Sequence, residues 1–235
     1  MKKKIITFLI LSILFCFTTE AQKGKVTIGI VAGTNFNQFT GKDYDGDKIN
    51  EAKLQRGSHA GFNVEIPVVS NFALQAGLQF IIKGSKRNDE SAILGKYTVT
   101  HSAYYIEMPL KIVFKPQAGK GNFLFGVGTD IGYGIGGKWK GDFANGSQLD
   151  QSGKIKYKNT IPPNQNPDEQ FIRPIDVSIS VLIGYQFSNN IFFQFDGQLG
   201  LTKINPDASP ADPDDKTNIK NVGLGLTLGY RFGKK

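Results

Sequence analysis

The chain has 235 residues, of which 40% are hydrophobic and 20% are charged, and its formal net charge is +8 at pH 7. This balance excludes a disordered chain and a bundle of membrane helices, and the single cysteine excludes a disulfide scaffold and cysteine-ligated metal sites. The 28 glycines, 18 phenylalanines and 8 tyrosines favour an all-β protein, because turns use glycine and strands favour aromatic side chains.

Residues 1–21 have the parts of a cleavable signal peptide. Lysines occupy positions 2–4, an apolar run covers residues 5–17, and a small-x-small cleavage site follows. Acylation of Cys16, as in a lipoprotein, is disfavoured by the bulky residue before it. We therefore expect an exported protein whose mature chain, residues 22–235, is one barrel domain without cysteine.

Beyond the signal peptide, apolar and polar residues alternate with a period of two in eight segments. In the third segment, Phe72, Leu74 and Ala76 share one face, and Gln75 and Gly77 share the other. No apolar run approaches the roughly 20 residues of a membrane helix, whereas about ten residues are enough for a tilted strand to cross a bilayer. The eight predicted strands cover residues 26–35, 59–66, 72–83, 104–114, 125–135, 175–185, 191–201 and 221–232.

The connections between the predicted strands alternate between short and long. Short connections cover residues 70–71, 115–122 and 188–190, and long polar ones cover residues 37–56, 84–97, 138–172 and 204–218. Short turns on one side and long loops on the other are typical of outer-membrane barrels, whose even strand number puts both termini on the periplasmic side. An interfacial aromatic girdle is also predicted beside the short turns, at Phe72, Phe114, Phe123, Phe187 and Phe232. The sequence thus predicts an all-β, eight-stranded antiparallel up-and-down transmembrane β-barrel.

The alternative is a soluble lipocalin-like barrel in the periplasm, with apolar residues inside. Alternation alone does not say which face points outward. Three features favour lipid outside: the polar face is crowded with glycine and small residues, the four loops are unusually long for a compact soluble barrel, and the chain ends close to the last aromatic residue of the last strand.

Three segments resemble the PorT-like family of small outer-membrane β-barrels, which is abundant in Bacteroidota. They are residues 29–36 (GIVAGTNF), 105–110 (YIEMPL) and 229–232 (GYRF), and the likeness extends over residues 23–232. Tyr230 and Phe232 also resemble the terminal signal read by the barrel-assembly machinery, although three further residues follow them here. The resemblance implies an outer-membrane barrel of a Gram-negative cell. The family's name-giving member works in type IX secretion, and no residue here carries that role over.

Charged residues on the predicted inward face are the most informative candidates for a site. An eight-stranded barrel encloses room for little beyond its own side chains, and an unpaired buried charge costs several kcal/mol. These groups should therefore pair with one another and form a lumen polar network that argues against an open pore. Glu107 and Lys111 lie about 13 Å apart on one strand, so each needs partners on other strands. The set comprises Glu65, Lys83, Glu107, Lys111, Asp130, Asp176, Asp196 and Arg231.

The remaining motifs are weaker indications of a functional site. Residues 132–137 fit G-x-G-x-x-G, but no helix follows them, as a dinucleotide site requires. Aspartates at 43–47 and 207–215 are typical of solvated loops and do not match a calcium-binding loop. His59 and His101 are predicted to fill the lumen, because a hydrolase would need a serine on the same face, and the adjacent serines point to the other. We expect no catalytic residue, metal or cofactor.

The functional expectation is a non-enzymatic outer-membrane barrel with a structural or interaction role through its extracellular loops, chiefly residues 138–172. A narrow channel or transport accessory is an alternative, as is an accessory subunit of a secretion or uptake complex. Expected partners are outer-membrane lipid or lipopolysaccharide, the barrel-assembly machinery during insertion, and a protein at the extracellular loops. Lysine and arginine are spread over loops and turns, which favours anionic lipid headgroups over nucleic acid.

Overall fold

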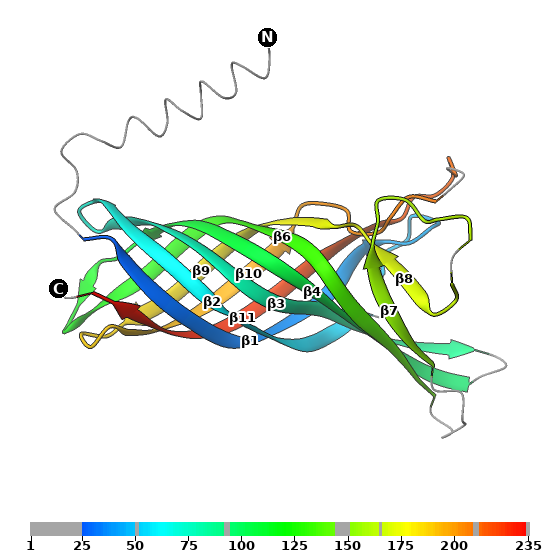
Figure 1. Ribbon diagram of the computed structural model, residues 1–235, viewed down its shortest axis with the longest axis horizontal. Helices are drawn as coiled ribbons and strands as arrows, with labels where there is room; N and C mark the ends of the chain where they lie inside the picture. The colour runs from blue at the N-terminus through cyan, green and yellow to red at the C-terminus, as the bar shows by residue number, and fades with distance from the viewer. Residues whose placement is uncertain are drawn as a thin grey trace, which may run out of the picture.

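The computed structural model is a closed barrel, seen from the side in Figure 1. It describes residues 25–49, 52–91, 95–143, 151–164, 166–208 and 212–233. The strands of the ring are β1 (Thr27–Lys42), β2 (Ala52–Val69), β3 (Phe72–Ser91), β4 (Gly95–Phe114), β6 (Gly121–Phe143), β9 (Ile175–Gln186), β10 (Ile191–Gly200) and β11 (Asn218–Phe232). Each is antiparallel to the next, and β11 pairs with β1 to close the ring. The predicted eight-stranded up-and-down barrel is confirmed.

Two of the predicted long loops are largely strand. Residues 37–56 were expected as a loop, but β1 continues to Lys42 and β2 begins at Ala52. The expected loop at 84–97 is also mostly strand, because β3 continues to Ser91 and β4 begins at Gly95. Alternation of apolar and polar residues ends where contact with lipid would end, whereas backbone pairing needs no apolar side chain. The sequence pattern therefore identifies the apolar belt but underestimates the length of the strands.

The segment 138–172 was also expected to be one long loop, and this is wrong for much of it. β6 runs to Phe143, and β7 (Gln151–Tyr157) pairs with the end of β6. β8 (Glu169–Ile172) then lies parallel to β7. These strands fold over one end of the barrel, which is the right-hand end in Figure 1.

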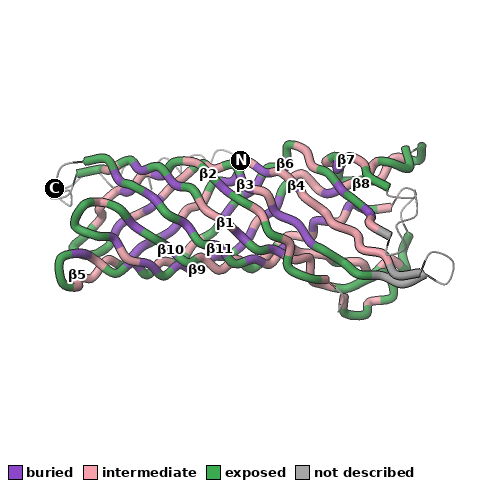
Figure 2. Tube along the Cα trace, turned by 90° about the horizontal axis from the view of Figure 1, so that it is seen from below, coloured by how far each residue is buried: buried purple, intermediate pink, exposed green. Residues whose placement is uncertain are grey.

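The two faces of the barrel wall differ sharply. Apolar side chains such as Ile30, Phe62 and Leu228 are exposed on the outside, while the intervening polar or glycine positions point inward. Figure 2 shows this alternation of buried and exposed residues along the strands. A continuous exposed apolar band fits lipid contact and is the reverse of a lipocalin-like barrel, so that alternative is not supported.

The short turns and the chain ends share one end of the barrel. The start of β1 pairs with the end of β11, where Ile28 lies opposite Phe232. β5 (Gln117–Ala118) forms a small hairpin with β6 in the turn after β4. The five phenylalanines of the predicted girdle are exposed beside these turns, and the rings of Phe72 and Phe114 lie 4.9 Å apart.

The predicted signal peptide, residues 1–21, lies outside the described residues. In the part of the chain that is described, no helix is long and apolar enough to cross a membrane. The ring strands, which lie between residues 27 and 232, are hydrogen-bonded into one sheet.

Candidate functional site

The inward charged residues form three groups inside the barrel, two of which are joined by a glutamine side chain. In the first group, Lys83 from β3 lies between two carboxylates, with its Nζ 3.0 Å from Asp176 Oδ2 and ion-paired to Glu107. Gln79 donates a hydrogen bond to Glu107 Oε1 at 2.9 Å, and Asn221 donates one to Asp176 Oδ2 at 3.0 Å. All three charged side chains are fully buried, so each charge depends on these partners.

The second group surrounds Lys111 on β4. Its Nζ lies 2.8 Å from Asp196 Oδ1 and 3.7 Å from Asp130 Oδ1. Gln198 joins this group to the first, because its amide nitrogen lies 2.8 Å from Asp130 Oδ2 and 3.2 Å from Glu107 Oε1. Glu107 and Lys111 thus have partners on other strands.

The third group lies near the short turns and centres on Glu65. Arg231 and Lys115 both form ion pairs with this carboxylate. Lys115 also donates to Gln186 Oε1 at 3.0 Å, and the Arg231 guanidinium lies 4.8 Å from the ring centre of Phe192. Sequence reasoning missed Lys115, because it falls in the connection after β4, where alternation no longer assigns a face.

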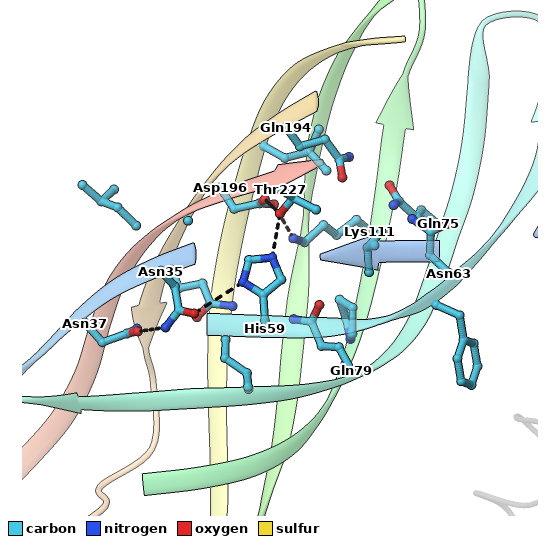
Figure 3. Close-up of a pocket in the computed structure, with 18 residues that line it drawn as sticks. Asn35, Asn37, His59, Asn63, Gln75, Gln79, Lys111, Gln194, Asp196 and Thr227 are labelled. Carbon is cyan, nitrogen blue, oxygen red and sulfur yellow. Dashed lines mark hydrogen bonds and ion pairs between the residues drawn. The ribbon is translucent and has the colours of Figure 1, made fainter. Parts of the chain in front are cut away.

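A small polar cavity lies beside the Lys111 group (Figure 3). His59 borders it, with Nδ1 3.4 Å from Asn35 Oδ1 and Nε2 2.9 Å from Thr227 Oγ1. The cavity volume is about 50 Å³, room for about three or four water molecules. These contacts place His59 among amide and hydroxyl groups inside the barrel, and its neighbour Ser58 pairs with Thr34 on the opposite face.

Two apolar clusters flank the Lys83 and Lys111 groups. The inner cap, near the short turns, consists of Val31, Val113, Leu124, Leu182 and Phe192. The outer cap, at the other end, consists of Ile81, Ala103, Tyr105, Trp139, Ile155, Ile172 and Ile204. The Lys83 and Lys111 groups therefore lie in a polar layer between two apolar layers. The Glu65 group lies on the short-turn side of the inner cap, because Glu65 is opposite Thr27, four residues nearer that end of β1 than Val31.

The outer cap is built largely by β7 and its neighbours. The Tyr157 hydroxyl donates to the Tyr104 carbonyl at 3.2 Å, and the rings of Tyr157 and Tyr105 meet edge to face at 5.4 Å. The Trp139 indole donates to the Asp168 carbonyl at 3.0 Å. These bonds tie the segment between β6 and β9 to the wall of the barrel.

The surrounding loops are tied together by charged groups. Asp207 receives hydrogen bonds from Lys203 at 3.3 Å and from Arg173 at 2.6 Å, and these bonds lower the pKa of its carboxyl group. The Tyr44 hydroxyl donates to Asp212 at 2.7 Å, which raises the pKa of this tyrosine. Among the described residues, no group of three or more histidine, cysteine or acidic side chains is placed to hold a metal ion.

The glycine-rich motif and the second histidine also have structural neighbours. Residues 132–137 belong to β6, and the ring of Tyr157 lies directly over Gly134. His101 reaches toward the outer end of the barrel, where its Nε2 lies 2.6 Å from Gln170 Oε1 of β8. Both features therefore help to attach the outer segment.

Comparison with known proteins identifies a matching protein family. A family model described as an outer membrane protein beta-barrel domain matches residues 20–205. No curated protein sequence matches the chain. Among solved structures, Ail, the attachment invasion locus protein of Yersinia pestis, is similar at 14% identity and a TM-score of 0.39, over 89% of this chain and 100% of its own. The outer membrane protein OprG of Pseudomonas aeruginosa is similar at 11% identity and a TM-score of 0.44, over 92% of this chain and 100% of its own.

Proposed function

Because the chain belongs to the outer membrane protein beta-barrel domain family, we propose that it is a closed, non-enzymatic barrel of the outer membrane that acts through contacts at its extracellular end. The observation that carries this proposal is the filling of the lumen. Two charged groups, joined by Gln198, lie between an inner and an outer apolar cap, and a third charged group lies on the short-turn side of the inner cap. Moving a hydrated solute through this interior would require breaking buried ion pairs, which is costly.

The first test is conductance in planar lipid bilayers. We expect purified protein to insert without discrete conductance steps, because the caps and the ion-paired network fill the path. Insertion is checked separately by the change in gel mobility between unboiled and boiled samples in detergent. Reproducible steps from correctly inserted protein, altered by Glu107→Gln, would instead support the narrow channel.

A row of lysines supports an anionic partner at the outer leaflet. Lys53 lies directly opposite Lys86, Lys86 lies opposite Thr100, and Thr100 lies opposite Lys140, so three lysines share one outward face across four strands. All three are exposed, and Lys140 also forms an ion pair with Asp142 two residues along β6. Lys53 and Lys86 are directly opposite each other, and like charges in this arrangement destabilise a sheet. An anion bound between the two lysines would offset that cost.

The height of this row also fits a headgroup layer. Lys86 lies four residues beyond Ile82 on the same face of β3, which is about 13 Å along the strand. Ile82 is near the upper edge of the apolar belt. This height supports contact of the row with the phosphate and carboxylate groups of lipopolysaccharide or another anionic lipid.

We expect the triple variant Lys53→Gln, Lys86→Gln and Lys140→Gln to bind lipopolysaccharide roughly a hundredfold more weakly, since each lysine near an anionic surface contributes about 1 kcal/mol. Binding is measured by calorimetry with the protein in neutral-lipid nanodiscs. The control, Lys48→Gln, Lys120→Gln and Lys216→Gln, removes the same charge elsewhere. Equal losses in both variants would show a net-charge effect and would contradict a specific row.

Several finer expectations stay proposals. For a protein partner, we propose contact with the exposed residues of 138–172, among them residues 158–160 and 166–168, whereas Ile155 of β7 and Ile172 of β8 are buried in the outer cap. Membership of the PorT-like group is supported by the likeness at 105–110. Recognition by the assembly machinery is supported by the exposed rings of Tyr230 and Phe232, 5.1 Å apart at the end of β11.

A further inference from the structure

We propose that a pocket at the extracellular mouth binds a small amphiphilic carboxylate, with its chain on the outer cap and its carboxylate toward Arg87. The mouth pocket has a volume of about 320 Å³ and lies between the ends of β1, β3, β4 and β11 on one side and β8 and residues 204–205 on the other. Pockets for small ligands begin near about 300 Å³ and are mostly apolar with a few placed polar groups.

The floor and walls of the mouth pocket are apolar. Ile172 and Ile204 belong to the outer cap, and Phe39, Val99 and Ile219 pack against that cap while lining the pocket. The pocket is therefore open to the outside and separated from the charged lumen by the cap beneath it. A ligand here would gain apolar burial without disturbing the ion pairs.

The polar groups of the pocket favour an anion. Arg87 lies opposite Val99 in the β3–β4 hairpin and lines the pocket. Among the described lining residues, it is the one whose side chain carries a full charge at neutral pH, and none of them is acidic. A guanidinium at the rim of an apolar pocket attracts a carboxylate, and its five N–H donors allow it to bind one beside another partner.

Two further polar residues line the pocket, one from β4 and one from β8. His101 is two residues from Val99 on the same face of β4, and Gln170 of β8 lies within hydrogen-bond distance of its imidazole. The Phe39 ring centre is 5.7 Å from the His101 ring centre, which joins the apolar wall to this polar edge. The apolar chain of an amphiphile would therefore lie against the apolar wall, and its headgroup would lie at the polar edge.

The test uses octanoate, octanol and octylamine with full-length mature protein in neutral-lipid nanodiscs, measured by calorimetry with empty nanodiscs subtracted. We expect saturable binding in which octanoate binds about tenfold more tightly than octanol, and octylamine more weakly than both, since a charge-assisted contact is worth about 1.4 kcal/mol. Trp139, the single tryptophan, belongs to the outer cap and gives an independent fluorescence signal.

Two matched variants separate the pocket from the surface. Arg87→Gln should remove the preference of octanoate over octanol, whereas Arg56→Gln, the same loss of charge at an exposed position of β2 opposite the outward-facing Phe36, should leave it unchanged. Val99→Phe fills the pocket and should abolish binding of all three probes while the gel-mobility shift is kept. Equal affinity for octanoate and octylamine, or binding that survives Val99→Phe, would overturn the proposal. A conducting barrel would still contain this pocket, so this inference and the proposed closed lumen fail separately.

Discussion

Replacing Lys83 by methionine is expected to lower the free energy of unfolding of the barrel by about 3–5 kcal/mol. Lys83 is 1% exposed, and its two carboxylate partners, Glu107 and Asp176, are each 0% exposed. Methionine keeps the length of the side chain and removes its charge, so both carboxylates would be buried without the cation that compensates them. Protonation of one carboxylate would limit the cost but would also break the hydrogen bonds that these oxygens accept.

Unfolding in urea, followed by the gel-mobility shift of protein in lipid vesicles, measures this change through the transition midpoint. Lys86→Met is the matched control, because Lys86 lies on the same strand but is exposed on the outer face, and surface changes usually stay within about 0.5 kcal/mol. A loss below about 1 kcal/mol for Lys83→Met would show that water reaches the triad, contrary to the filled lumen.

A second variant keeps the test decisive if Lys83→Met fails to fold. Combining Lys83→Met with Glu107→Gln and Asp176→Asn removes all three charges while nearly preserving the shape of each side chain. Replacing a whole buried ionic group is often neutral, whereas removing one member is costly. We therefore expect the triple variant to recover most of the lost stability.

The architecture was predictable because lipid and a crowded interior impose opposite demands on neighbouring residues. Every second residue must be apolar to face lipid, and the residues between must fit inside, so alternation identifies both the strands and their inward face. The inward positions of Glu65, Asp196 and Arg231 follow from this rule alone. The ends of the strands could not be predicted in this way. Beyond the apolar belt, the hairpins pair through backbone groups, and this pairing does not appear in the hydropathy pattern.

The partners in the ion pairs inside the lumen could not be predicted from the sequence. Lys83 and Asp176 are separated by 93 residues, and their meeting depends on the tilt and stagger of all the strands between them. The outer cap was missed for another reason. In β7, lysines flank Ile155, and this short alternating run resembles a polar loop, although Ile155 and Tyr157 do share one face.

Gly134→Ala is expected to loosen the outer cap and leave the rest of the barrel folded. A Cβ at this position would lie 2.0 Å from Tyr157 Cε1, far inside van der Waals contact. The ring cannot simply turn aside, because its hydroxyl is bonded to the Tyr104 carbonyl and its edge meets Tyr105. Forcing extra volume into a packed site costs about 1–3 kcal/mol, so we expect protease cleavage within residues 151–172 to accelerate about tenfold or more.

Gly141→Ala is the matched control on the same strand, because its Cβ would find no atom closer than 3.7 Å and cleavage should stay at the wild-type rate. Cleavage sites are mapped by mass spectrometry on protein in nanodiscs, and Trp139 emission should shift to longer wavelength only in Gly134→Ala. Equal cleavage rates in both variants would show that Tyr157 does not hold the cap.

The same variant also separates the two barriers in the lumen. If the outer cap alone closes the barrel, Gly134→Ala should begin to conduct in planar bilayers. We expect it to stay silent, because Lys83, Glu107 and Lys111 remain ion-paired below the displaced ring. Octanoate binding, by contrast, should weaken, since Ile172 at the floor of the mouth pocket belongs to the cap that moves. Loss of ligand binding without conductance would therefore assign closure to the charged network together with the inner cap, and recognition to the outer cap.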